Sequence, residues 1–361
     1  MISIEFYKGL PLKYESFLVE KYDSFYTTCR YLEIYCPTFD INYMSVFDDG
    51  HLIDLLIFAN RGNTSTCFNS LVGIDQNIIT AFTKAIFEKY PSIQKVEIKG
   101  WYKEYNEKKS ILFSKSNDYI ISLPSTMDEY FSELGSKTRQ HLKNYKARLS
   151  RDFPLINFVT KFGVDIKEVE IDRIIQMNID RMKYKGITPG RNNSDKTSFY
   201  RYSQHYGCAS YIEIDGVIVA GCISTILNKR IFLQVISHDN NYSKYNVGQL
   251  CILYLIQTSI EKGLLMLHFL WGENEYKKRL LAKPHTLSSY LIYKSYSLDF
   301  FVRKVNTTFS HVLIRVRHSK YIKPIRDAIK FYRRKKWNAV TSIFAQIFTL
   351  NTALQTLISL I

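Results

Sequence analysis

Residues 209–237, ASYIEIDGVIVAGCISTILNKRIFLQVIS, predict three consecutive antiparallel strands. Asp215-Gly216 is typical of a tight hairpin turn, and Asn228-Lys229 indicates a second turn. A polar stretch follows, and the apolar spacing over residues 247–262 then predicts a buried amphipathic helix. An apolar strand at 264–271 completes this β-β-β-α-β order.

The segments on either side extend the same mixed pattern. A short helix is expected at 276–281 and a last strand at 287–293, while residues 136–151 form a basic segment with helical composition. The first 125 residues also mix helical and strand patterns. The sequence therefore predicts an α/β (α+β) protein.

Charge limits the choice of partner. The 361 residues include 49 Lys and Arg against 33 Asp and Glu, a net charge of +16. Such a charge favours an anionic partner, namely nucleic acid, an anionic membrane or a phosphate-bearing small molecule. Neither a P-loop nor a G-x-G-x-x-G motif is present, which argues against nucleotide hydrolysis and Rossmann dinucleotide binding. No nucleic-acid-binding motif is recognisable, so no specific nucleic acid is expected.

The six cysteines contain no C-x-x-C pair, so the sequence predicts reduced thiols, no disulfide framework and no metal site. No signal peptide is visible, and a cytoplasmic location is expected.

The C-terminal segment leaves two interpretations open. Residues 337–361 carry no charged side chain and follow the basic run Arg333-Arg-Lys-Lys336. This segment either docks on an anionic membrane surface, at the inner face of the cytoplasmic membrane, or packs on the protein or on a partner such as an envelope-synthesis complex.

The loop Asn246-Val-Gly248-Gln249 enters the predicted helix at 247–262. Unpaired amides and the helix dipole at such a start favour phosphate, and a glycine permits close approach. The alternative is that Gly248 is an ordinary turn residue.

Three segments carry a resemblance to a known family. They are Gly135-Ser-Lys-Thr-Arg139-Gln140 with the basic helix after it, Tyr242-Ser-Lys-Tyr-Asn-Val-Gly-Gln-Leu250, and Phe269-Leu-Trp-Gly-Glu-Asn-Glu-Tyr-Lys-Lys-Arg279. In order and spacing they resemble the GNAT-type N-acetyltransferase superfamily, specifically its CelD/FemAB-like branch with a BioF-like acetyltransferase domain. The resemblance covers roughly residues 127–293.

This resemblance implies two tandem acetyltransferase-like mixed-sheet modules. We expect an N-terminal module at 1–126, a donor-binding module at 127–305 and a basic, amphipathic helical tail at 306–361. The acyl donor, acyl-CoA with acetyl-CoA foremost, would enter between two strands that part, here 230–237 and 264–271.

The same resemblance implies a set of donor-binding residues. A pantetheine arm would lie along one strand, and a pyrophosphate would lie at the start of the following helix. The residues implied are Gln234, Val235 and Ser237 for the arm, and Val247, Gly248, Gln249 and Leu250 for the pyrophosphate.

Two residues are candidates for catalysis. Glu273 follows a strand end, where a carboxylate can act as general base or orient the acceptor. Tyr276 can protonate the leaving thiolate. The alternatives are a structural carboxylate and a half-buried structural tyrosine.

Four residues are candidates for binding the acceptor. Arg139 and Lys143 on the basic helix suit an anionic acceptor such as a nucleotide sugar or sugar acid. Lys277 can contact an acceptor phosphate, and His238 can act as a base. Solvated side chains and, for His238, a turn with local hydrogen bonds are the alternatives.

The function implied is an acyltransferase that acylates an amine or hydroxyl of a sugar, glycan or glycoconjugate in bacterial envelope or exopolysaccharide biosynthesis. One alternative is a Fem-like aminoacyl transferase that uses aminoacyl-tRNA. Another is a non-catalytic subunit of a polysaccharide synthase complex that retains the fold.

Overall fold

The computed structural model describes residues 2–307. The strands are β1 Ile2–Lys8, β2 Ile41–Asp48, β3 His51–Arg61, β4 Thr64–Cys67, β5 Lys95–Trp101, β6 Ser110–Ser122, β7 Ile156–Phe162, β8 Gly207–Ile214, β9 Val217–Leu227, β10 Arg230–His238, β11 Met266–His268 and β12 Lys283–Tyr293. The α-helices are α1 Glu15–Tyr22, α2 Cys29–Tyr35, α3 Gln76–Lys89, α4 Met127–Glu133, α5 Ser136–Asp152, α6 Glu168–Tyr184, α7 Asn193–Tyr206, α8 Val247–Glu261 and α9 Glu275–Arg279. A 3₁₀ helix, η2 Phe25–Thr27, lies between α1 and α2.

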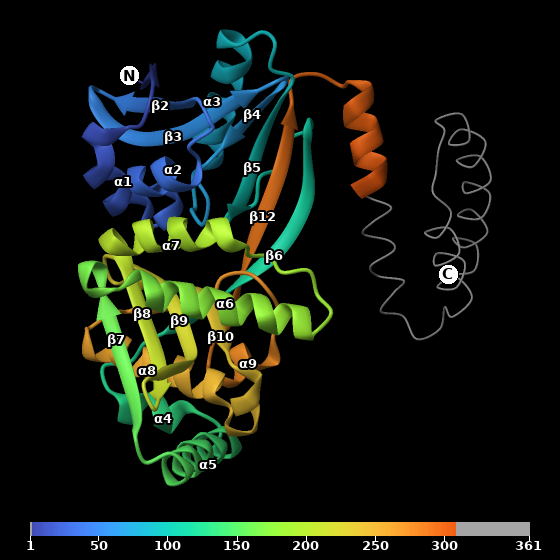
Figure 1. Cartoon of the computed structure of the whole chain (residues 1–361). Helices are drawn as coiled ribbons and strands as arrows, with labels where there is room; N and C mark the ends of the chain where they lie inside the picture. Colours follow the sequence, from blue (N-terminus) through green and yellow to red (C-terminus); the bar gives the residue numbers. More distant parts are fainter. Residues whose placement is uncertain (1, 308–361) are drawn as a thin grey trace, which may run out of the picture. The chain divides into compact units, whose positions relative to one another are not determined.

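All strands belong to one mixed sheet of twelve strands, in the order β1-β2-β3-β4-β5-β12-β6-β11-β10-β9-β8-β7 (Figure 1). Each half of the chain contributes a run of antiparallel strands followed by one parallel neighbour. These parallel pairs are β4 with β5 in the first half and β10 with β11 in the second. The mixed α/β class predicted from the sequence is thus confirmed.

The two halves exchange strands at the centre of the sheet. The last strand, β12, lies between β5 and β6, which both come from the first half. It pairs with β6 from Lys283 opposite Ile120 to Ile292 opposite Ser110. In turn β6 pairs with β11 of the second half. Residues 2–300 therefore form one compact unit.

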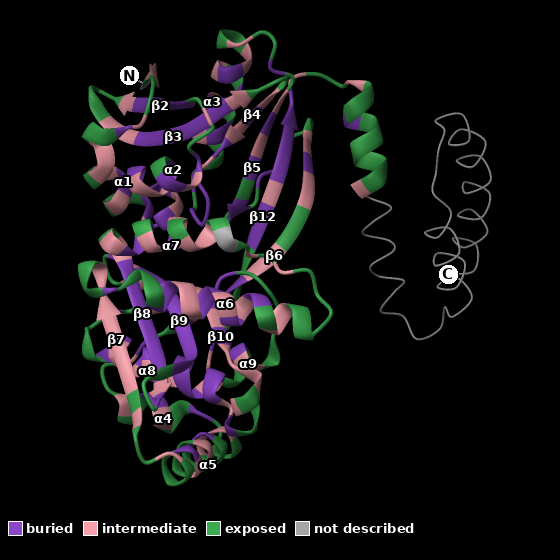
Figure 2. Cartoon of the chain, in the orientation of Figure 1, coloured by how far each residue is buried: buried purple, intermediate pink, exposed green. Residues whose placement is uncertain are grey.

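The second half has apolar cores on both faces of its sheet. Its strands β8 and β9 are buried along most of their length (Figure 2). On one face, α6 and α7 cover β8 to β10, with Ile171 and Ile174 fully buried. On the other face, α8 packs with Leu255 and Ile256 against the same strands. Because α8 is covered by strands on one side and by α5 on the other, its sequence is apolar nearly all round.

Several expected elements are present as predicted. The three-strand meander is β8, β9 and β10, the helix at 247–262 is α8, and the basic segment is α5. The strand expected at 264–271 is shorter, because regular pairing covers only Met266–His268. The backbone then turns away, with positive φ at Leu270 (55°) and Gly272 (97°).

Two further expectations concern the boundary between the modules and the C-terminal tail. The division at residue 127 remains a prediction, since both halves share the sheet. The expected tail, 306–361, lies outside the described residues apart from 306 and 307. Within residues 2–307, every helix is too short or too polar to cross a membrane.

Candidate active site

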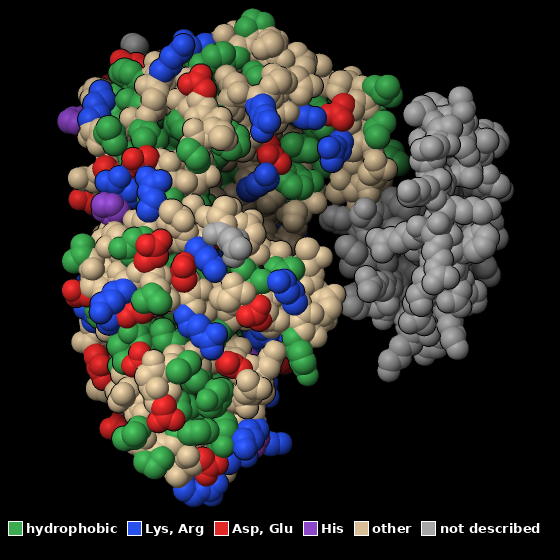
Figure 3. Space-filling model, viewed as in Figure 1, with side chains coloured by type: hydrophobic (Ala, Val, Ile, Leu, Met, Phe, Trp, Pro, Cys, Tyr) green, Lys and Arg blue, Asp and Glu red, His purple; other side chains and the backbone are tan. Residues whose placement is uncertain are grey.

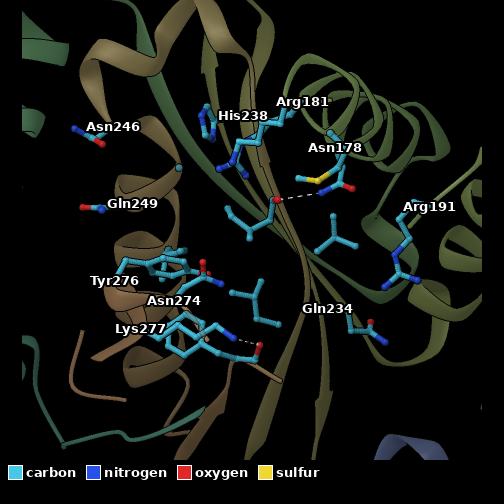
Figure 4. A pocket seen from close by; sticks show the side chains of 18 of the residues that line it. Asn178, Arg181, Arg191, Gln234, His238, Asn246, Gln249, Asn274, Tyr276 and Lys277 are labelled. Atoms are coloured by element: carbon cyan, nitrogen blue, oxygen red, sulfur yellow. Dashed lines mark hydrogen bonds between the residues drawn. The ribbon is translucent and has the colours of Figure 1, made fainter. Parts of the chain in front are cut away.

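Strands β10 and β11 part soon after they meet. They pair in parallel only from Arg230 opposite Met266 to Phe232 opposite His268. A β-bulge at Gln234 then shifts the register of β10 against β9. Past this point lies a cavity of about 430 Å³, here called the slot, between β10, α6, α8 and the segment after β11 (Figure 4).

Lys277 holds one wall of the slot. Its ammonium donates to four successive carbonyls, those of Phe269 (3.2 Å), Leu270 (3.2 Å), Trp271 (3.0 Å) and Gly272 (2.8 Å). The side chain is only 2% exposed, and burial lowers its pKa to about 8. This network fixes the segment after β11 in the conformation that leads it away from β10. Its ammonium is therefore already engaged by the backbone, whereas the sequence suggested a contact with an acceptor phosphate.

The start of α8 forms the floor of the slot. Asn246 precedes it in the left-handed region (φ 52°) and does not cap it with its side chain. The first amides of a helix lack intrahelical acceptors, so they favour an anion. A Cβ on Gly248 would lie 2.9 Å from Nδ1 of His238. The imidazole therefore packs directly on the backbone at Gly248, and it needs a glycine there.

Three cations beside a neutral histidine give the slot its charge. Burial, reinforced by Arg181 and Lys185, lowers the pKa of His238 to about 4, so its imidazole is neutral at pH 7. Burial also lowers the pKa of Arg181, whereas its positive charge lowers the pKa of Lys185. Arg191, from the loop before α7, adds a third cation. None of the three makes an ion pair with a carboxylate in the described part of the chain, and no described Asp or Glu lines the slot.

This concentration of charge is local. Over the molecular face in Figure 3, basic and acidic side chains are interspersed. The slot, by contrast, is lined by Arg181, Lys185 and Arg191 and by no described carboxylate. Figure 4 shows Arg181 beside His238, with Asn274, Tyr276 and Lys277 below them. The slot therefore favours an anionic ligand more strongly than that face does.

Of the two catalytic candidates, only Tyr276 lines the slot. Its ring is half-buried against the edge of Phe269, and burial raises its pKa to about 12. The phenol therefore keeps its proton at neutral pH and can donate it. Glu273 is exposed outside the slot, where its carboxylate accepts a hydrogen bond from Nδ2 of Asn117 (3.1 Å).

The other predicted site residues divide in the same way. Those that line the slot are Gln234, Val235, His238, Gly248, Gln249 and Lys277. Those that do not are Ser237, Val247, Leu250, Arg139 and Lys143. The Ser237 hydroxyl donates to the carbonyl of Ile174 (2.7 Å), and Val247 and Leu250 are buried in the core. Arg139 donates to the carbonyls of Phe131 and Ser132 (both 3.1 Å), and Lys143 is exposed on α5.

Sequence reasoning missed the contribution of α6. Asn178 and Arg181 line the slot together with Met182 on the same face of α6, and Lys185, directly after the helix, lines it too; Asn178, Arg181 and Lys185 are polar. Asn178 donates to the carbonyl of Ile236 in β10 (3.3 Å). This polar stripe beside the apolar face of α6 was the available signal.

The equivalent junction in the first half is closed. After β4 and β5 pair, Val72 bridges to Trp101, and Leu71 N donates to Gly100 O (2.8 Å). Trp101 is 1% exposed, and its indole donates to Asn69 O (2.7 Å). The helix that follows, α3, is capped by Asp75, which accepts from Asn77 N (2.9 Å).

Comparison with known proteins agrees with this geometry. The family described as "Acetyltransferase (GNAT) domain" matches residues 205–278, which run from the end of α7 to α9. No curated protein matches the chain.

The solved structures that share the fold include FemX and a protein from Bacteroides thetaiotaomicron. FemX matches with 9% identity and a TM-score of 0.57, covering 79% of this chain and 96% of FemX. The Bacteroides thetaiotaomicron protein, a conserved protein of unknown function, matches with 12% identity and a TM-score of 0.51, covering 81% of this chain and all of that protein. Residues 205–278 thus form an acetyltransferase (GNAT) domain that contains most of the slot, within a chain that shares the fold of FemX.

Proposed function

We propose that this protein is an acyltransferase whose activated acyl donor binds in the slot between β10 and β11. The strongest support is the parting of these strands beside the uncapped start of α8. A donor held there would present its acyl carbon near Tyr276 to an amine or hydroxyl of a second substrate. The enzyme would act by orienting the two reactants and by supplying a proton to the leaving group.

The charges support a donor that carries phosphate. Arg181, Lys185 and Arg191 face a cavity that no described carboxylate lines, and the neutral His238 can donate a hydrogen bond. Guanidinium groups bind phosphate oxygens with two parallel hydrogen bonds. Both donors considered from the sequence, aminoacyl-tRNA and acyl-CoA, contain phosphates.

Of the two, we favour aminoacyl-tRNA, as in a Fem-like aminoacyl transferase. The imidazole of His238 packs against Gly248, so it leaves less room beside this helix start for a pyrophosphate of acyl-CoA. The shared fold with FemX is consistent with this choice, and the net charge of +16 suits an RNA donor. Acyl-CoA is the second candidate, favoured by the match to the acetyltransferase (GNAT) domain.

We place the acceptor among the sugars or glycoconjugates of the bacterial envelope, at the inner face of the cytoplasmic membrane. This part of the proposal rests on the resemblance of the sequence to the CelD/FemAB-like branch.

Donor binding by the full chain tests the proposal. Calorimetric titrations would use acetyl-CoA in one series and total aminoacyl-tRNA, with uncharged tRNA as reference, in another. We expect aminoacyl-tRNA to bind, and Arg181→Ala to weaken it at least tenfold, about 1.4 kcal/mol. Lys183→Ala is the matched control, because Lys183 is exposed on the same helix and does not line the slot.

Three results would change the conclusion. If only acetyl-CoA binds saturably, and free CoA competes with it, the donor is acyl-CoA and not aminoacyl-tRNA. If the folded protein binds neither donor, the acyltransferase proposal is wrong. If the Arg181 and Lys183 variants lose donor affinity equally, the donor does not bind in the slot.

A further inference from the structure

A second cavity, here called the chamber, adjoins the slot and has a volume of about 300 Å³. The residues that line both cavities are Arg191, Leu233, Gln234, Phe269 and Trp271. The rest of the chamber wall consists of Phe25, Tyr26, Tyr31, Tyr35, Phe199 and Leu270. Residues of η2 and α2 from the first half thus face the slot of the second half across the bulge in β10.

Aromatic rings make up most of this wall, and they hold one another in place. The rings of Tyr31 and Tyr35 stack with centroids 4.8 Å apart, and the Tyr26 ring contacts the edge of Trp271 at 5.7 Å. Rings fixed in this way offer rigid apolar faces at low entropic cost. Such faces suit a ring-shaped ligand with C–H groups above and below its plane.

Polar atoms among these rings specify the ligand further. Burial raises the pKa of Tyr26, Tyr31 and Tyr35, so all three phenols remain neutral hydrogen-bond donors. The Tyr35 hydroxyl is buried and has no hydrogen-bond partner in the described part of the chain. In native proteins a water or ligand usually satisfies such a group. Several hydroxyls beside apolar faces match a sugar ring better than a plain aromatic ring, which could not pair with them.

Arg191 supplies the charge of the chamber. Its guanidinium lies over the Phe199 ring, 4.8 Å from the centroid, and makes no ion pair with a described carboxylate. A guanidinium held by an aromatic face keeps its N–H donors available at its edges. The complementary ligand group is a phosphate or a carboxylate.

We propose that the chamber is the acceptor site and binds a sugar ring bearing a phosphate or carboxylate, whose anionic group lies at Arg191. This inference rests on the proposed function. The acceptor amine or hydroxyl would face Gln234, on the border with the slot. Its nitrogen or oxygen forms a bond to the acyl carbon, while the bond from that carbon to the donor's ester oxygen or thioester sulfur breaks. The acceptor loses one proton, and the departing oxygen or sulfur gains one.

Calorimetry on the full chain with simple probes tests this inference. The probes are glucose 1-phosphate, glucuronate, glucose, inorganic phosphate and 4-hydroxybenzoate. We expect at least one of the two anionic sugars to bind, with glucose and inorganic phosphate each at least tenfold weaker. Arg191→Gln should weaken that binding at least tenfold and Tyr35→Phe several-fold. Arg201→Gln, exposed on α7 and outside the chamber, should leave it unchanged.

Two outcomes would overturn the inference. One is tighter binding of 4-hydroxybenzoate than of both anionic sugars, and the other is no binding of either sugar by the folded protein. Donor titrations on the same preparation separate this failure from failure of the proposed function. If the protein binds a donor but no anionic sugar, the slot remains the donor site and the chamber is not the acceptor site. If it binds a sugar but no donor, the chamber is a sugar site and the protein is not an acyltransferase.

Discussion

The two parallel junctions of the sheet, β4 with β5 and β10 with β11, have the same local order and opposite outcomes. In each, a strand leads through a loop and a helix to a parallel neighbour. The first junction is closed by the bridge from Val72 to Trp101, and its helix is capped by Asp75. The second remains open, and its helix start has no side-chain cap.

The difference shows what turns a common fold into a binding site. In the first junction the chain closes the gap itself, through the bridge from Val72 to Trp101 and the hydrogen bond from Leu71 N to Gly100 O. In the second, the Lys277 ammonium binds four successive carbonyls of the segment that leads away from β10. One half therefore uses this position for stability, while the other leaves it available to a ligand.

Removing the buried indole at the closed junction should have the largest effect on stability. Trp101→Ala removes a fully buried indole, and we expect the free energy of unfolding to fall by about 4 kcal/mol. The control is Trp271→Ala, since Trp271 is 40% exposed at the open junction; its loss should be about 1 kcal/mol or less. Urea denaturation would measure both. Similar losses would mean that the two junctions do not differ in packing as described.

Removing the ammonium from the open junction should come next. Lys277→Met keeps the length of the side chain but leaves four carbonyls without their donor. We expect a loss of about 3 kcal/mol in the free energy of unfolding, together with loss of donor binding. Lys278→Met, which breaks only an exposed contact with Glu275 (3.8 Å), should cost less than about 0.5 kcal/mol. Unaltered donor binding in the Lys277 variant would contradict its role in holding the slot.

The smallest effect concerns pH at the open helix start. The pKa of His238 is about 4 in the folded protein, below the ordinary histidine pKa of about 6.5. Between these values the unfolded chain takes up a proton that the folded protein does not, so stability falls as pH falls from about 6.5 to 4. Allowing for partial exposure of the ring, the loss should be about 1–2 kcal/mol.

Comparing the wild type with His238→Asn isolates this contribution. Urea denaturation at pH 7.5 and pH 4.5 should show a smaller acid-induced loss in the variant. The helix start at the closed junction has no histidine, so no histidine titration contributes there. Equal losses in the two proteins would show that His238 is not shielded as the structure indicates.

The sequence predicted the local part of this arrangement. Hairpin signals such as Asp215-Gly216 and the apolar spacing of α8 depend on neighbouring residues, and the corresponding elements are present. The resemblance to the CelD/FemAB-like branch predicted where two strands part, and the structure agrees. The insertion of β12 between β5 and β6 could not be predicted, because pairing across such a sequence distance leaves no local pattern.

The site was predicted less completely than the fold. Residues next to the open junction, such as Gln234 and Gly248, line the slot as expected. Arg139 does not line the slot and donates to nearby carbonyls, and its role in acceptor binding stays a prediction, because a basic helix face has the same sequence pattern whether or not it binds substrate. Arg181 and Tyr35 reach the two cavities from elements distant in the sequence, so only the folded arrangement brings them to the site.

The exchanged strand also determines how the protein can be divided. A fragment that ends before Lys283 would lack β12, so β5 and β6 would each present an unpaired edge in the middle of the sheet. A fragment that begins after Ser122 would leave β11 without its neighbour β6 and β12 without either partner. Neither half is therefore a self-sufficient folding unit, and heat or denaturant should melt residues 2–300 in one cooperative step rather than half by half.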